Sequence, residues 1–139
     1  MPAARILIIE DERQTVDSLR DLFEQHGFET EVALNRHVAL SILQERSMDI
    51  AIVSTMIQDV SGLEILEEIK KQCADLPVIM ISDQKSKRLE ISSLKAGASV
   101  FLVKPLDNSF VLRTIEKLFE ARYAAVVTNK RGARPKPKK

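Results

Sequence analysis

Short runs rich in isoleucine and valine alternate along this chain with segments in which apolar residues recur every three or four positions. The runs occupy residues 5–9, 30–34, 50–53, 78–81 and 100–103, and the run at 30–34 is the most polar. Strands that are apolar without alternation are buried on both faces, which requires a parallel sheet covered by helices. Five such strand–helix units predict the α/β class, as a flavodoxin-like (βα)5 three-layer sandwich with a parallel five-stranded sheet of order 2-1-3-4-5.

The length of 139 residues fits one compact domain, which we place at residues 1–127, followed by a basic tail at residues 128–139. From Lys130 onward the chain has six basic residues and no acid. Removing these six from the 21 basic residues leaves 15 against 20 acids, so residues 1–127 carry a net charge of −5. Two prolines, one glycine and no large apolar side chain predict a mobile tail. It is a linker or solubilising end, or it contacts a polyanion non-specifically.

The composition excludes several classes of protein. The single cysteine, Cys73, rules out an internal disulfide framework and a cysteine zinc site. The longest apolar runs are far shorter than the roughly 20 residues that a membrane-spanning helix needs. The N-terminus has no signal-peptide pattern. We therefore expect a cytoplasmic domain with no membrane partner.

Polar side chains follow the predicted strands at the edge where ligands bind in open parallel sheets. These residues are Glu10, Asp11 and Glu12 after the first run, Ser54 after the run at 50–53, Ser82 and Asp83 after the run at 78–81, and Lys104 and Pro105 after the last. Carboxylates, hydroxyls and a lysine are therefore expected to meet at one rim of the sheet.

Four segments resemble the receiver domain of two-component response regulators: ILIIEDE (6–12), DIAIVSTMIQDVSGLEIL (49–66), LPVIMISDQ (76–84) and GASVFLVKP (97–105). The resemblance runs from residue 4 to about residue 125. It implies a signalling module rather than an enzyme. In that family an acid pair binds magnesium, and an aspartate ending the third strand accepts a phosphoryl group from a histidine kinase. A Thr or Ser hydroxyl and a lysine then contact that phosphoryl group.

The resemblance places the magnesium-binding acid pair at Glu10 and Asp11, with the backbone carbonyl of Met56 as a further metal ligand. The remaining positions are Ser82 for the hydroxyl, Phe101 for the aromatic switch residue, and Lys104 with Pro105 for the lysine and a following cis peptide. Because a lysine near two carboxylates satisfies both without metal, we expect Lys104 to pair with Glu10 and Asp11. No cofactor is then required, and magnesium binding is weak if it occurs.

The phosphoacceptor position falls on Ser54, not on an aspartate. The register is fixed by Asp49 before the strand and by residues 61–63 after it. Asp49 belongs to the opposite end of the strand and Asp59 to the following loop, so neither can take the place of the missing carboxylate. A serine hydroxyl needs a base to become a nucleophile, and no histidine falls at a strand end.

Two further departures weaken the resemblance at the site. Gln58 replaces the usual proline of the loop, and Asp83 stands where a small residue leaves room for the phosphoryl group. We interpret the chain as a degenerate receiver, a pseudo-receiver, that acts through phosphorylation-independent protein contacts. The alternatives are a phosphorelay receiver that keeps regulated phosphorylation or metal binding, or a regulator that contacts nucleic acid non-specifically through its tail.

The expected partner surface is formed by the fourth helical segment, the last strand and the last helical segment. Its basic residues are Lys85, Lys87, Arg88, Lys95, Arg113 and Lys117. A protein partner or a second copy of the chain would dock there. No helix-turn-helix follows the receiver-like region, so sequence-specific binding of nucleic acid is not expected.

Overall fold

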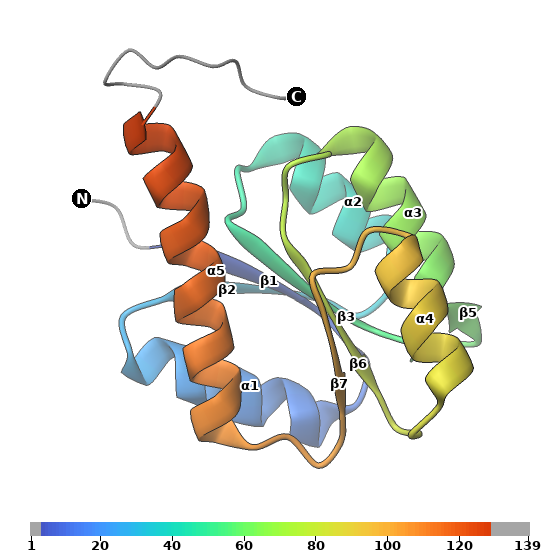
Figure 1. Ribbon diagram of the computed structural model, residues 1–139. Helices are drawn as coiled ribbons and strands as arrows, with labels where there is room; N and C mark the ends of the chain where they lie inside the picture. The colour runs from blue at the N-terminus through green and yellow to red at the C-terminus, as the bar shows by residue number, and fades with distance from the viewer. Residues whose placement is uncertain (1–3, 129–139) are drawn as a thin grey trace.

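The computed structural model describes residues 4–128 as a five-stranded parallel sheet between two layers of helices (Figure 1). The sheet strands are β1 (Arg5–Ile9), β2 (Glu29–Ala33), β3 (Ile50–Ser54), β6 (Val78–Ser82) and β7 (Val100–Val103), in the order β2-β1-β3-β6-β7. Counted along the chain, this is the predicted order 2-1-3-4-5, and the flavodoxin-like fold is confirmed. The helices are α1 (Arg13–Gln25), α2 (Arg36–Glu45), α3 (Gly62–Gln72), α4 (Lys87–Lys95) and α5 (Asn108–Thr128).

The two faces of the sheet carry separate apolar cores. Along β1, Ile6 and Ile8 pack with residues of α1 and α5, whereas Leu7 and Ile9 pack with residues of α2 and α3. All four side chains are fully buried, and burial of a side chain of this size stabilises the fold by about 2 kcal/mol. Burial on both faces is the reason that β1 lacks the polar–apolar alternation of a half-exposed strand.

Most helices begin a few residues after a strand, at a residue whose side chain caps the first turn. The side chains of Asn35, Ser61 and Ser86 accept hydrogen bonds from backbone N–H groups in the first turns of α2, α3 and α4. Before α5, Asp107 Oδ1 accepts the N–H of Phe110 at 3.1 Å. Glu12 precedes α1, and its side chain accepts no backbone N–H group of that helix.

A two-stranded hairpin that the sequence pattern did not predict follows β3. It consists of β4 (Met56–Ile57) and β5 (Val60–Ser61), paired antiparallel. Its turn residues Gln58 and Asp59 have positive φ angles of 49° and 66°. A proline ring fixes φ near −65°, so this turn requires a residue other than proline at position 58.

The predicted tail, residues 128–139, lies outside the described residues except for Thr128, the last residue of α5. Between residues 4 and 128, no helix combines the length and the apolar character needed to cross a membrane.

Gly62 marks the point where α3 meets the end of β3. A Cβ atom at Gly62 would lie 2.0 Å from the carbonyl oxygen of Ser54, whereas a Cβ atom at Gly27 would have no atom within 4 Å. The backbone of α3 therefore approaches Ser54 as closely as only glycine permits. This contact holds the end of β3 against the start of α3.

We predict that Gly62→Ala lowers the free energy of unfolding by about 3 kcal/mol, because backbone must move to admit the methyl group. The control is Gly27→Ala, where φ is +87° and space is free. This change should cost only about 1 kcal/mol from backbone conformation. Urea unfolding of both variants measures the difference, and equal losses would contradict the close approach at Gly62.

Candidate functional site

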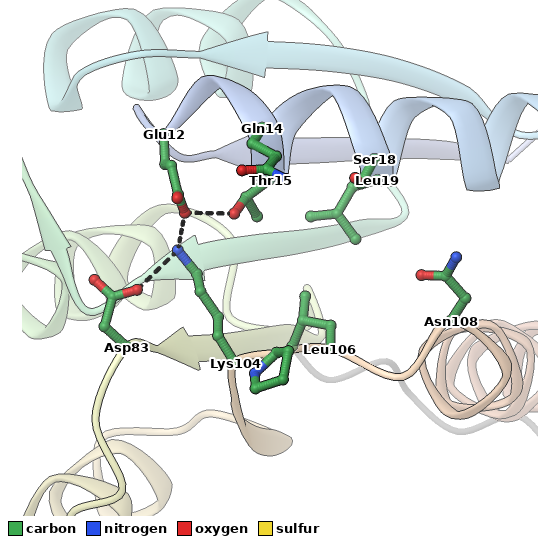
Figure 2. A pocket seen from close by; sticks show the side chains of 10 residues that line it. Glu12, Gln14, Thr15, Ser18, Leu19, Asp83, Lys104, Leu106 and Asn108 are labelled. Atoms are coloured by element: carbon green, nitrogen blue, oxygen red, sulfur yellow. Dashed lines mark hydrogen bonds and ion pairs between the residues drawn. The ribbon is translucent and has the colours of Figure 1, made fainter.

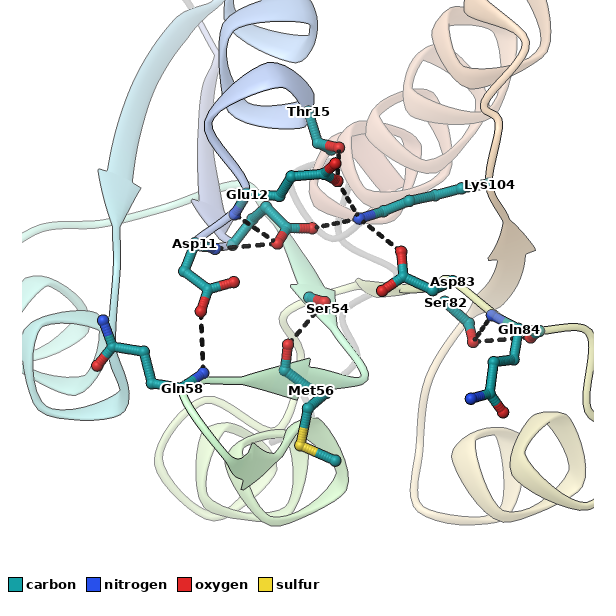
Figure 3. Close-up of polar contacts among 11 residues, drawn as sticks. Asp11, Glu12, Thr15, Ser54, Met56, Gln58, Ser82, Asp83, Gln84 and Lys104 are labelled. Carbon is teal, nitrogen blue, oxygen red and sulfur yellow. Dashed lines mark hydrogen bonds and ion pairs between the residues drawn. The ribbon is translucent and has the colours of Figure 1, made fainter.

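The parallel register brings the predicted rim residues together at one edge of the sheet. Ser54 pairs with Ile81, and Ser82 pairs with Val103, so the ends of β3, β6 and β7 are level. Figure 3 shows the side chains that follow these strands and β1 around a common space. The predicted rim is confirmed as a place where these residues meet.

The ammonium group of Lys104 lies among three carboxylates, of which Figure 2 shows those of Glu12 and Asp83. Its Nζ atom is 3.1 Å from Glu10 Oε1, 2.8 Å from Glu12 Oε1 and 3.1 Å from Asp83 Oδ1. Burial alone would lower the pKa of Lys104, but its contacts with these carboxylates outweigh burial and raise the pKa above its usual value. Lys104 is therefore held as a cation. We call these four residues the Lys104 cluster.

Glu10 is the buried member of the Lys104 cluster, with 1% of the residue exposed. Its Oε2 atom accepts the backbone N–H groups of Asp11 and Glu12, each at 2.9 Å. Its Oε1 atom faces the ammonium group of Lys104, which balances the charge of the carboxylate by the ion pair. A buried carboxylate is costly without such compensation.

Asp11 does not contact Lys104, so the expected pairing of Lys104 with both acids is correct for Glu10 and wrong for Asp11. Asp11 Oδ2 instead accepts the backbone N–H of Gln58 at 2.9 Å (Figure 3). Proline has no N–H to donate, so this contact depends on the replacement of the loop proline. Asp11 therefore contacts the turn of the β4–β5 hairpin and not the ammonium group of Lys104.

Glu12 was expected at the rim, but no role was predicted for it. Its Oε1 atom accepts hydrogen bonds from Lys104 at 2.8 Å and from Thr15 Oγ1 at 2.6 Å. The bond from Lys104, followed by the bond from Thr15, holds the pKa of Glu12 below its usual value. Its position next to the acid pair, at the start of α1, could have predicted a contact with Lys104.

Ser54 lies at the end of β3 and is 4% exposed. Its Oγ atom donates a hydrogen bond to the carbonyl oxygen of Met56 at 3.2 Å. Ser82 is bonded to the loop that follows it: its hydroxyl donates to the Gln84 carbonyl at 2.8 Å and accepts the Gln84 N–H at 3.0 Å. Each hydroxyl is thus bonded to backbone two residues further on.

The other positions implied by the resemblance lie on β7 and just after it. Phe101 is half-buried and packs against the core on the side of α2 and α3. The peptide bond between Lys104 and Pro105 is cis, as expected.

The described residues do not fit a tightly held magnesium ion. Magnesium prefers six oxygen ligands in octahedral geometry. The Met56 carbonyl accepts the Ser54 hydroxyl, Asp11 accepts the Gln58 N–H, and Glu10 faces the ammonium group of Lys104. No group of three or more potential metal-ligating His, Cys, Asp or Glu side chains is arranged to hold a metal in the part of the chain that the structure describes.

The family model of the response regulator receiver domain matches residues 6–116, most of the chain. The chain belongs to the response regulator receiver family. Receiver domains serve two-component signalling through contacts with other proteins, such as effector domains. The resemblance seen in the sequence is therefore confirmed at the level of the family.

Known receiver-containing proteins share both sequence and fold with this chain. An NtrX-like response regulator of Rickettsia bellii is 31% identical over 117 residues, which cover 83% of this chain and 24% of the relative. A CheY-like receiver domain from Methanospirillum hungatei superposes with a TM-score of 0.81 at 29% identity, over 88% of this chain and 98% of that one. The receiver domain of NtrX from Brucella abortus gives 0.79 at 30% identity, over 83% and 98%.

This receiver domain spans about a quarter of the length of the NtrX-like and ZraR relatives it matches, at 24% and 25%. In those longer proteins, the receiver is one part of a regulator.

We predict that Lys104→Met lowers the free energy of unfolding at pH 7 by about 2 kcal/mol, because it leaves the buried Glu10 without its cation. The lowered pKa of Glu12 adds stability that is present above the ordinary glutamate pKa and is lost as the pH falls through the lowered value. The raised pKa of Lys104 keeps its contribution intact throughout that range. The difference from the unmodified protein should therefore shrink below about pH 4.

Chemical denaturation at several pH values measures this difference. Glu12→Gln is the control, because it removes only the half-exposed contact and should cost less than about 1 kcal/mol. A Lys104→Met variant as stable as the unmodified protein at pH 7 would show that Glu10 does not need the ion pair.

Proposed function

We propose that this receiver domain signals without phosphorylation at the end of β3, as an interaction module of the cytoplasm with no enzymatic activity. The observation that carries the proposal is Ser54, whose hydroxyl stands at the phosphoacceptor position and donates to the carbonyl of Met56. The family's chemistry requires a carboxylate there. The chain is, on this proposal, a pseudo-receiver.

The surroundings of Ser54 support this reading. Transfer of a phosphoryl group to a hydroxyl needs a base that removes the proton. The Oγ atom of Ser54 is bonded to a carbonyl oxygen, which is not a base of useful strength. No described hydrogen bond joins Ser54 to a neighbouring acid: Glu10 contacts Lys104 and two backbone N–H groups, and Asp11 Oδ2 accepts the N–H of Gln58.

Lys104 places a fixed positive charge among the acids of the rim. Its ion pairs connect the ends of β1, β6 and β7 with the start of α1. The hydroxyl of Ser82 is hydrogen-bonded to the backbone of Gln84 in the loop after β6, so its position does not depend on a phosphoryl group. These contacts favour a single resting conformation in which neither magnesium nor a phosphoryl group is needed.

We propose the face formed by α4, β7 and α5 as the surface for a protein partner. Apolar side chains are exposed there: Ile91 and Leu94 on α4 and Phe110 on α5 are 44–46% exposed. The guanidinium of Arg113 lies 5.9 Å from the centroid of the Phe110 ring. Exposed apolar side chains among basic residues fit a partner with an acidic surface, and a second copy of the chain is the alternative occupant.

The first test is phosphotransfer. Incubation with acetyl phosphate and magnesium should give no acyl phosphate, because Ser54 has no carboxylate to form one. Intact mass before and after hydroxylamine treatment measures this outcome. A stoichiometric phosphoprotein that hydroxylamine cleaves would overturn the proposal.

The second test is magnesium affinity. The unmodified protein should bind magnesium with a dissociation constant in the millimolar range or weaker, which corresponds to about 4 kcal/mol or less. Ser54→Asp should tighten binding, because each added carboxylate increases the attraction for a hard cation. Ser54→Asn is the uncharged control and should not. Titration followed by amide NMR gives all three affinities, and micromolar binding by the unmodified protein would contradict the expectation.

A further inference from the structure

A cavity of about 480 Å³ lies beside the Lys104 cluster, between α1 and the link from β7 to α5. Figure 2 shows Glu12, Asp83 and Lys104 at one end of it, and Ser18 and Asn108 at the other. Cavities of about 300–1,000 Å³ are typical of small-molecule sites. The proposed function uses the Lys104 cluster but assigns no role to this space.

The charged end of the cavity is negative. The lining there has two acids, Glu12 and Asp83, and one base, Lys104, whose charge the buried Glu10 also shares. Each lining carboxylate gives one oxygen to Lys104, at 2.8 Å and 3.1 Å. The side chains of Glu12 and Asp83 remain 52% and 74% exposed, so each can still accept hydrogen bonds from a ligand.

The rest of the cavity combines an apolar floor with neutral polar walls. Leu19 is buried and Leu106 is half-buried, both within the core shared by α1 and α5. Gln14 and Ser18 on α1 and Asn108 on α5 are exposed along the walls. Together they offer amide and hydroxyl groups opposite the carboxylates.

The charges that line the cavity favour a cationic ligand over an anionic one. An anion would meet two carboxylates, and the one lining base is already neutralised by three acids. A cation would gain two partly exposed carboxylates at the charged end. An aliphatic stem would lie over Leu19 and Leu106, and a polar group at its far end would reach Ser18 and Asn108.

We propose that this cavity binds a small organic cation, an ammonium or guanidinium group on a short aliphatic stem. Such a ligand would contact α1, the residue after β6 and the link from β7 to α5 at once. It would compete with Lys104 for Glu12 and Asp83, and so act on the cluster that joins these elements. The proposal is independent of whether Ser54 can be phosphorylated, because Ser54 does not line the cavity.

The test uses pentane-1,5-diamine, titrated to about 10 mM at constant ionic strength and followed by amide NMR of the full chain. We expect saturable shifts at Thr15, Leu106 and Asn108. Pentanedioate, which has the same stem with carboxylates at both ends, should give none. No saturable shift with the diamine, or equal binding of the dicarboxylate, would overturn the proposal.

Three variants locate the binding. Asp83→Asn should weaken it about fivefold, the upper range for one partly exposed ion pair. Ser18→Phe, which fills the cavity from an exposed helical position, should abolish it. Asp75→Asn, an exposed acid of equal charge that does not line the cavity, should leave the affinity unchanged. Loss of binding in Asp75→Asn, or unchanged binding in Ser18→Phe, would show that the diamine follows net charge and not this cavity.

Discussion

The ion pairs of Lys104 are the interaction on which the rest of the rim depends. One ammonium group serves carboxylates that come from the end of β1, the start of α1 and the end of β6. Because Glu10 is buried, its negative charge at that position requires a fixed cation, and Lys104 provides it. The strand ends, the first turn of α1 and the link to α5 are therefore tied to one side chain.

Much of this architecture could be predicted from the sequence. The five apolar runs predict a parallel sheet of the observed order, because strands buried on both faces are apolar throughout. The rim is predicted because the carboxyl ends of parallel strands lie at one edge of the sheet. The pairing of Asp11 and the role of Glu12 were not predictable in this way. The contact of Asp11 depends on a turn whose residues, Gln58 and Asp59, lack the Asn-Gly signature of a two-residue hairpin. The contacts of Glu12 depend on the direction of its side chain toward Lys104 and Thr15.

The fold is common to the receiver family, and the chemistry of this chain depends on the side chains at one edge of it. The fold and membership of the receiver family rest on 111 matched residues, positions 6–116. The proposed function rests on a few contacts: Ser54 with the Met56 carbonyl, Asp11 with the Gln58 N–H, and Lys104 with its three acids. All lie at one edge of the sheet, so the sheet can be kept while the chemistry at its edge changes.

The contact between Asp11 and Gln58 also bears on how such a site could change in evolution. The donor is a backbone N–H, so substitutions at position 58 other than proline retain it, and proline would not fit the φ of +49° found there. A proline at position 58 would require the hairpin turn to be rebuilt, and it would remove the N–H that Asp11 Oδ2 accepts. Mutational tolerance at position 58 is therefore broad in side chain and narrow in backbone: the residue can vary freely while Asp11 keeps its place, except where the substitution is proline.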